Sequence, residues 1–467
     1  MQVGAMLVGW CDAIARETML FAAVWFVVGG VDDVLVDLLY LARRGWDRLR
    51  GRAARDGGAD TLPLPEAPAR IAVFVPAWDE STVIGAMLTT ALARFDYPDY
   101  RLYVGCYPND PATIDAVARV AEQDARVRIV VGTHPGPTTK ADCLNQLWQA
   151  LCADEARDGP VVGVLMHDAE DVVHPAELRI VAHFLMEYDA IQLPVLPLPH
   201  PRSRLVSGHY CDEFAEAHAK QLLVRQALGA GMPLAGVGCA IRRAMLGRIA
   251  AARGGAPFDA SSLTEDYELG LTVATMGGRA RLVRIAERRG GRPVAVRAFF
   301  PASLAAAVRQ KARWMTGIAL AGWDRVGWGA PGNLGDHWMR MRDRRTTLAM
   351  PVLAIAYLSL VAWGVSSLAH VATRTQGLGP AARLEPLLAA SAALFCWRLA
   401  VRAAFVGRAY GMVEALWSVP RVFVSNLVSL LAARRAVFLY LGMLAGMPPR
   451  WDKTMHQFPD HPDEVTA

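Results

Sequence analysis

Two uninterrupted apolar runs in the second half of the chain predict helices long enough to cross a lipid bilayer. Residues 347–369 form 23 consecutive positions without a charged side chain, and about 20 apolar residues suffice for a transmembrane helix. Residues 386–407 form the second run, in which Arg398 and Arg402 are the charged positions. These two arginines are one helical turn apart, so they share a face of the predicted helix.

A third apolar run, residues 18–42, carries the carboxylates Asp32, Asp33 and Asp37. Carboxylates inside a membrane are costly unless they face protein or water. Two interpretations are open: the carboxylates face other parts of the protein, or the helix leaves the bilayer near Val31.

The segment at residues 411–447 has a different pattern. Its apolar parts, residues 422–433 and 436–447, are separated by Arg434 and Arg435. This pattern favours helices that lie at the membrane surface over a clean span.

Arginine clusters predict the orientation of these helices. One cluster, within residues 43–55, follows the N-terminal run, and another, within residues 340–345, precedes the next run. Both flank the long middle region, so the positive-inside rule places that region in the cytoplasm. Three spans would leave the N-terminus and the loop at 370–385 outside and the C-terminal tail inside.

The middle region changes to short β-rich runs that alternate with helical patterns. The predicted strands are 71–75, 101–107, 127–131, 161–166 and 190–195. The predicted helices are 81–95, 111–124, 140–152 and 176–188. Apolar strands alternating with helices predict an α/β fold with a mostly parallel sheet covered on both faces. In such sheets, ligands bind beyond the carboxyl ends of the strands.

These patterns divide the chain into consecutive parts. They are an N-terminal membrane helix (1–45), a basic linker (46–69), a cytoplasmic α/β domain (70–325), two transmembrane helices (346–410), interfacial or membrane helices (411–447) and a cytoplasmic tail (448–467).

Composition narrows the function classes. The 467 residues are 53% hydrophobic and carry a formal net charge of +5, which is too mild to predict a nucleic-acid partner. The seven cysteines have no metal-binding spacing, so neither a disulfide framework nor a zinc site is expected. The lysines are Lys140, Lys220, Lys311 and Lys453 alone, so each is a candidate for a specific role.

Polar clusters follow three of the predicted strands. The candidates in them are Trp78 and Glu80 after the first strand, Asp110 after the second, and Asp168, Glu170 and Asp171 after the fourth. Any one cluster could be only a turn or a helix cap. Three acidic clusters at one sheet edge, however, repel each other unless a cation lies among them. The i, i+2 spacing of Asp168 and Glu170 suits an oxygen-ligated cation such as Mg²⁺.

Two further motifs begin predicted helices. Lys140 follows a turn, where an ammonium can contact a phosphate; the alternative is an exposed surface lysine. Glu265 and Asp266 follow Thr264 at a predicted helix start. Acidic residues are common at that position, but Asp266 could also be a general base.

Gln310, Arg313 and Trp314 share one face of a predicted helix. The indole of a tryptophan offers an apolar face against which a sugar ring can pack, and the guanidinium of an arginine can donate paired hydrogen bonds to a phosphate. The alternative is an amphipathic helix at the membrane surface with Trp314 as its interfacial anchor.

In this order, the motifs resemble those of the processive membrane glycosyltransferases of family 2. The motifs are Pro76 to Glu80, Asp110, Lys140, Asp168-Ala169-Glu170, Thr264-Glu265-Asp266 and Gln310 to Trp314. The chain is most similar to the bacteriophage adsorption protein B type of inner-membrane glycosyltransferases, through residues 31–38, 107–110, 167–171 and 451–454. Members of that group carry a further C-terminal domain that binds cyclic di-GMP. The residues after Thr454 leave no room for one, so we do not expect direct control by that nucleotide.

The resemblance implies a GT-A-like, Rossmann-like catalytic domain and a role for each motif. Trp78, Glu80, Asp110, Lys140 and Asp168 would bind a UDP-sugar, with Asp110 at the uracil and Lys140 at the diphosphate. Asp168 with Glu170 or Asp171 would hold Mg²⁺ or Mn²⁺. Asp266 would deprotonate the acceptor hydroxyl, and Glu265, Gln310, Arg313 and Trp314 would line the site of the acceptor and the leaving diphosphate.

Three functions are consistent with these patterns. The first is an inverting transferase that extends a polysaccharide and helps to export it. The second is a transferase that adds one sugar to a lipid acceptor. The third is a catalytically silent scaffold for surface assembly. Three spans are few for a translocation channel, so we expect a homo-oligomer or an export partner if the product is exported.

Overall fold

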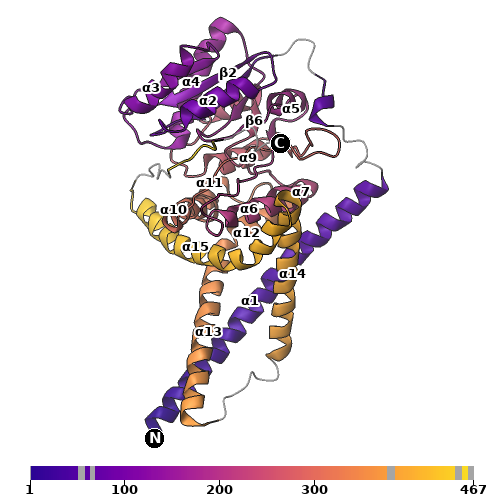
Figure 1. The fold of residues 1–467 in the computed structure, drawn as a ribbon, viewed down its shortest axis with the longest axis vertical. Coiled ribbons are helices and arrows are strands. Elements are labelled where there is room, and N and C mark those ends of the chain that lie inside the picture. Colours follow the sequence, from indigo (N-terminus) through magenta and orange to yellow (C-terminus); the bar gives the residue numbers. More distant parts are fainter. Residues whose placement is uncertain (1, 51–57, 64–68, 376–383, 448–454, 461–467) are drawn as a thin grey trace.

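The computed structural model describes residues 2–50, 58–63, 69–375, 384–447 and 455–460. Figure 1 shows an α/β part at one end of the molecule and three long helices, α1, α13 and α14, that extend away from it. The α/β part lies within the middle region for which the sequence predicts strands and helices in alternation.

Seven strands form one sheet in the order β3-β2-β1-β4-β6-β5-β7. They are β1 (Ile71–Pro76), β2 (Tyr100–Cys106), β3 (Val127–Val131), β4 (Gly163–Met166), β5 (Ala190–Gln192), β6 (Cys239–Arg242) and β7 (Ala280–Leu282). β1 pairs in parallel with β2 and β4, and β2 with β3, which confirms the mostly parallel sheet. β6 is antiparallel to β4 and β5. The sequence did not predict β6 and β7, because four and three residues are too few to establish a periodicity.

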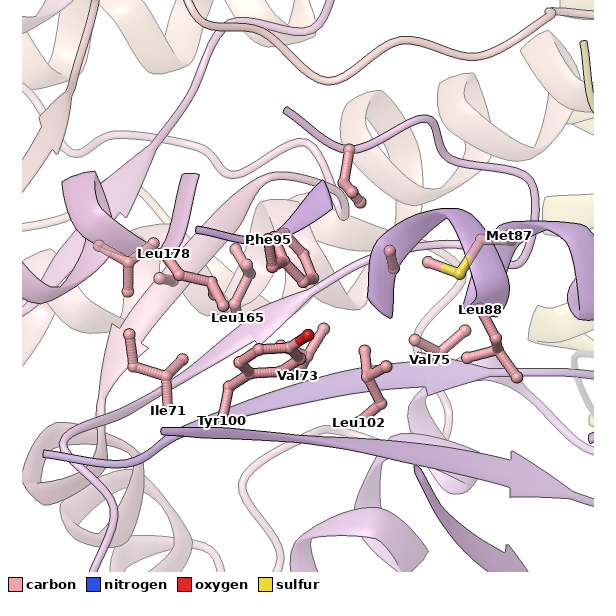
Figure 2. Close-up of a cluster of buried hydrophobic side chains, with 14 of the residues drawn as sticks. Ile71, Val73, Val75, Met87, Leu88, Phe95, Tyr100, Leu102, Leu165 and Leu178 are labelled. Atoms are coloured by element: carbon pink, nitrogen blue, oxygen red, sulfur yellow. The ribbon is translucent and has the colours of Figure 1, made fainter. Parts of the chain in front are cut away.

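Helices cover both faces of the sheet, because alternate side chains of each strand point to opposite faces. α2 (Ile84–Arg94), α3 (Pro111–Ala121) and α5 (Glu177–Phe184) pack on one face, and α4 (Lys140–Asp158), α8 (Arg243–Ala252) and α9 (Glu265–Thr275) on the other. Figure 2 shows part of the first cluster, in which Val75 of β1 lies next to Leu88 of α2. Each such fully buried side chain contributes about 1.5–3 kcal/mol.

Four helices of the described chain are long and apolar enough to cross a membrane. They are α1 (Gln2–Leu49), α13 (Thr346–Thr373), α14 (Glu385–Tyr410) and α15 (Met412–Leu444). α1 continues beyond the predicted end at residue 45. α15 is one unbroken helix that runs through Arg434 and Arg435, within the segment predicted to hold interfacial or membrane helices. Arg434 and Arg435 are exposed, and they therefore fit on the solvent-accessible surface of an unbroken helix.

The carboxylates of α1 face other protein side chains. Asp33 accepts from Arg342 at 2.9 Å and forms a further ion pair with Arg398 of α14. Asp37 forms an ion pair with Lys220 and accepts a hydrogen bond from the Trp397 indole at 2.8 Å. These contacts support the interpretation in which the carboxylates face other parts of the protein.

α15 lies across the ends of α13 and α14 and curves below α10 (Leu304–Trp314) and α6 (Gly208–Glu216) (Figure 1). The side that faces these helices is small or polar and includes buried Ser418, Arg421 and Ser425. The opposite side exposes large apolar side chains such as Phe423 and Leu427. This distribution is typical of a helix that lies along a membrane surface rather than one that crosses it.

Candidate functional site

The carboxyl ends of β1 and β4 and the start of α9 meet at one cleft of about 140 Å³. Ten of the residues singled out from sequence line it: Glu80, Lys140, Asp168, Glu170, Asp171, Glu265, Asp266 and the α10 group of Gln310, Arg313 and Trp314, which completes the wall. Segments more than 200 residues apart in the chain therefore converge where the parallel-sheet rule places a ligand.

Lys140 is the cation at the centre of this acidic cleft. Thr139 caps α4 by accepting from the Asp142 amide, and this cap sets Lys140 at the first position of the helix. The Lys140 ammonium lies 2.5 Å from Asp168 and 3.9 Å from Glu265. Burial opposes its charge, but these carboxylates outweigh that cost and raise the pKa of Lys140 above its usual range. The alternative of an exposed surface lysine is therefore wrong, since 18% of the side chain is exposed.

Glu265 and Asp266 stand at the start of α9, as predicted, although the Thr264 side chain makes no capping hydrogen bond. The Asp266 carboxylate accepts from the Tyr267 amide at 2.7 Å. Burial raises the pKa of Asp266, and burial together with the Asp266 charge raises the pKa of Glu265 to about 7. Burial thus raises the pKa of both carboxyl groups, and a carboxylate with a raised pKa is a stronger general base than an ordinary one.

A glycine makes room for this pair. Gly236 has φ +76°, and a Cβ built there would lie 2.6 Å from Asp266 Oδ2 and 3.3 Å from Lys140 Nζ. The backbone can approach the two side chains this closely because glycine alone has neither a side chain nor a penalty at this φ.

Glu80, Glu170 and His456 bring three ligand atoms within 4.8 Å of one another. His456 Nδ1 lies 2.8 Å from Glu80 Oε1 and 3.2 Å from Glu170 Oε2. Burial raises the pKa of Glu170 to about 8, and the two carboxylates raise the pKa of His456 to about 9 against the opposing effect of burial. Glu170 Oε2 is buried and accepts no hydrogen bond from the described residues. Two carboxylates and an imidazole form a donor set that suits Mg²⁺ or Mn²⁺.

Asp171 is held by a different set of contacts. It accepts from His167 Nδ1 and from the Asp168 amide, each at 2.9 Å. His167 also contacts Glu177 at 3.0 Å, and the two carboxylates raise its pKa to about 10 although it is fully buried. This network fixes the backbone of the Asp168 loop, so Asp171 has an evident structural role in addition to its predicted one.

Trp78 and Asp110 lie beside the cleft rather than in its lining. Asp110 accepts from the Asp79 amide at 2.6 Å and caps α3 by accepting from the Thr113 amide. The Trp78 ring packs edge-on against Tyr107 with centroids 5.2 Å apart. The loops after β1 and β2 are thereby joined into one surface with an aromatic face and a carboxylate, which suits a flat hydrogen-bonding base.

The α10 group lines the opposite wall. Trp314 packs against Tyr210 with centroids 5.9 Å apart and nearly perpendicular rings. Gln310 Oε1 is buried and accepts no hydrogen bond within the described chain. Lys311, in the same motif, points elsewhere, because its ammonium lies 2.5 Å from Glu213 of α6. Lys311 therefore links α10 to α6 through an ion pair.

Comparison with known proteins agrees with this geometry. Residues 68–317 match the family described as "Glycosyltransferase like family 2".

The chain belongs to glycosyltransferase family 2.

The relatives of this family 2 chain include two proteins named for bacteriophage adsorption. It is 35% identical over 484 aligned positions to "Bacteriophage adsorption protein B" of Escherichia coli K12 and to "Bacteriophage N4 adsorption protein B" of Escherichia coli O157:H7. Each alignment covers 96% of this chain and 63% of the relative, so the chain spans less than two thirds of their length.

A solved structure shares the fold. The mannosyltransferase PcManGT from Pyrobaculum calidifontis, in complex with GDP-Man and Mn²⁺, is 17% identical and superposes with a TM-score of 0.52. The match covers 90% of this chain and 99% of that one. The GT-A-like fold expected from the motifs is therefore confirmed.

His456 is the residue of this family 2 site that sequence reasoning missed. It lies 286 positions from Glu170 in the chain, after the four helices that are long and apolar enough to cross a membrane, and no local spacing links the two. Residues 455–460 place it in the cleft, where Phe458 packs against the sheet core and Gln457 contacts His200 at 3.2 Å. The predicted motif at residues 451–454, with Lys453, lies outside the described residues.

Proposed function

We propose that this protein is a membrane-bound, inverting glycosyltransferase that moves a sugar from a UDP-sugar to a growing polysaccharide. The observation that carries the proposal is the convergence of Lys140, Asp168 and Asp266 with the α10 group in one cleft. The cleft stands directly above helices whose exposed sides are apolar.

The nucleotide sugar would bind along the sheet edge. Its uracil would lie at the surface of Trp78 and Asp110, and Glu80 and Asp168 would border the ribose and sugar. Lys140 would contact the diphosphate, since an ammonium at a helix start attracts anions.

The acidic cleft fits a divalent cation. The predicted metal-binding carboxylates after β4 are Asp168, Glu170 and Asp171. Glu80 and His456 add ligand atoms beside Glu170. Mg²⁺ or Mn²⁺ bound there supplies charge that stabilises the leaving diphosphate.

Asp266 would act on the acceptor. Its carboxylate takes the proton of the acceptor hydroxyl, whose oxygen forms a bond to the anomeric carbon. The bond from that carbon to the diphosphate breaks on the opposite face, and the electron pair leaves with the diphosphate. Lys140 and Arg313 would already be in place to stabilise the negative charge that develops on the leaving diphosphate, so neither has to move during the reaction. Because one base suffices, no second carboxylate is needed as a covalent nucleophile.

Glu265, Gln310 and Trp314 would position the acceptor sugar. The Trp314 ring offers an apolar face for a sugar ring. The buried Gln310 carbonyl oxygen lacks a donor within the described residues, and a sugar hydroxyl could provide one.

We further propose that α1, α13 and α14 cross a bacterial inner membrane and that α15 lies on its cytoplasmic face beneath the catalytic domain. The exposed apolar side of α15, with Phe423 and Leu427, supports this arrangement. Three spans are few for a polysaccharide channel, so export would need a second copy or a partner protein.

Transfer of a single sugar to a lipid acceptor is the alternative function. The experiment that separates the functions offers UDP-sugars and GDP-mannose to the purified protein with Mg²⁺ or Mn²⁺. We expect UDP release with a polymeric product. A single-sugar lipid product would favour the alternative, and no nucleotide release from any donor would favour a silent scaffold.

A further inference from the structure

A second cavity, of about 370 Å³, lies away from the catalytic cleft. It is enclosed by the end of α1, the end of α14, the segments after β5 and β7, and the end of α6 with the helical turn that follows it, which supplies His218. Four arginines line it: Arg44 and Arg48 of α1, Arg284 after β7, and Arg408 of α14. We call it the arginine pocket.

The positive charge of the arginine pocket is not neutralised by the described protein. None of its four arginines forms an ion pair with a described carboxylate. By contrast, Arg398 and Arg402, earlier in α14, pair with Asp33 and Glu216. Arg284 remains accessible to solvent, but burial lowers its pKa and nearby Arg44 lowers it further. Unpaired like charges held together in this way favour a bound anion.

The arginine pocket also has an apolar part. Leu41, Leu196 and Phe405 line it together with Tyr40, whose ring packs edge-on against Phe405 with centroids 5.4 Å apart. A site for a soluble anion does not need such a wall. A ligand with a charged head and an apolar tail would use both parts.

The position of the arginine pocket corresponds to a membrane boundary. From Leu20 to Leu41 the exposed side chains of α1 are apolar, and beyond Leu41 they include Arg43, Arg44 and Arg48. α14 likewise ends at Tyr410 just after Arg408. Both helices reach the α/β part at this level (Figure 1). Basic pockets between helices at the cytoplasmic boundary are typical sites for anionic lipid head groups.

We infer that the arginine pocket binds the phosphate head group of an anionic phospholipid, with the acyl chains directed along α1 and α14. The lipid would fill the gap between the helices and the catalytic domain and neutralise the four arginines. This site is separate from donor and acceptor binding, so it does not depend on the proposed catalytic function.

The test measures lipid binding to the full chain in neutral detergent micelles by native mass spectrometry. Phosphatidylglycerol, zwitterionic phosphatidylcholine and inorganic phosphate are titrated separately. We expect one phosphatidylglycerol to bind with clear preference over phosphatidylcholine. The double variant Arg44→Gln/Arg48→Gln should bind it about thirtyfold more weakly, since two phosphate-facing charges are lost.

The matched control is Arg43→Gln/Arg50→Gln, which removes two charges from the same helix end without altering the lining of the arginine pocket. Its affinity for phosphatidylglycerol should stay within about threefold of the wild type, because only long-range attraction changes. Equal losses in the two double variants would overturn the proposal, as would equal binding of phosphatidylcholine. Binding of inorganic phosphate as tight as that of the lipid would also overturn it, by identifying the ligand as a soluble anion.

Discussion

Replacing Asp266 with asparagine removes a proton acceptor while keeping nearly the same shape in the cleft. The carboxylate accepts from the Tyr267 amide at 2.7 Å, and an asparagine oxygen can accept the same bond. Lys140 keeps its contact with Asp168 at 2.5 Å. We therefore expect the variant to fold normally and to keep the cation at the diphosphate site.

The expected loss follows from the role of a general base. Such a base contributes about 10²–10⁴-fold to a rate, which corresponds to about 3–5.5 kcal/mol in the barrier. Donor affinity should be unchanged or slightly higher, because one negative charge near the diphosphate is removed. The effect should thus fall on kcat, and the KM for the donor should stay within about threefold.

The assay follows UDP release from the purified protein, and donor binding is measured separately by calorimetry. Asp142→Asn is the matched control, because Asp142 lies in the first turn of α4 and does not line the cleft. It should leave kcat within about twofold. Turnover of Asp266→Asn close to that of the wild type would refute the assignment of the base, as would a loss confined to donor binding.

The same carboxyl pair predicts the pH dependence of transfer. A base must be ionised, and burial raises the pKa of Asp266 above the ordinary value of 3.8. Glu265, whose pKa is raised to about 7, titrates beside it. As pH falls, the rate should therefore decrease above pH 3.8, and an acid limb at or below that pH would contradict this reasoning.

Three further substitutions test other parts of the structure. Gly236→Ala should lower kcat on the order of 100-fold by displacing Asp266, with an unchanged circular dichroism spectrum as control; activity near the wild-type level would show that the close approach is unimportant. Arg421→Met should lower the free energy of unfolding by about 3–5 kcal/mol, since Arg421 is buried 3.0 Å from Asp212; a chemical-denaturation change under 1 kcal/mol would contradict the role of this pair in fixing α15. His456→Gln should weaken Mn²⁺ binding on the order of tenfold in a spin-resonance titration, and unchanged affinity would exclude His456 as a ligand.

The sheet and its ligand-binding edge could be predicted because local patterns encode them. β1 to β4 are apolar runs bounded by polar turns, and parallel pairing follows from the helices between them. β6 and β7 could not be predicted, because their four and three residues are extended only through pairing with neighbours distant in sequence. For residues 411–447 the sequence predicted interfacial or membrane helices, and it did not show that one helix runs through Arg434 and Arg435, because these residues interrupt the apolar pattern but not the helical backbone.

The residues of the candidate site likewise differ in whether the local sequence reveals them. Lys140, Asp168 and Asp266 each have a local signal, at a strand end or a helix start. His456 has none, because it reaches Glu80 and Glu170 only through the packing of residues 455–460 against the domain. The arginine pocket was likewise hidden, since its four arginines come from three distant parts of the chain.

The anomeric configuration of the transferred sugar tests the central claim most directly. Nuclear magnetic resonance can follow the first turnovers of an α-linked UDP-sugar on the purified protein. Single displacement with Asp266 as the base predicts a β-linked product at the earliest time points. An α-linked product would require two displacements or a different mechanism, and it would contradict the account.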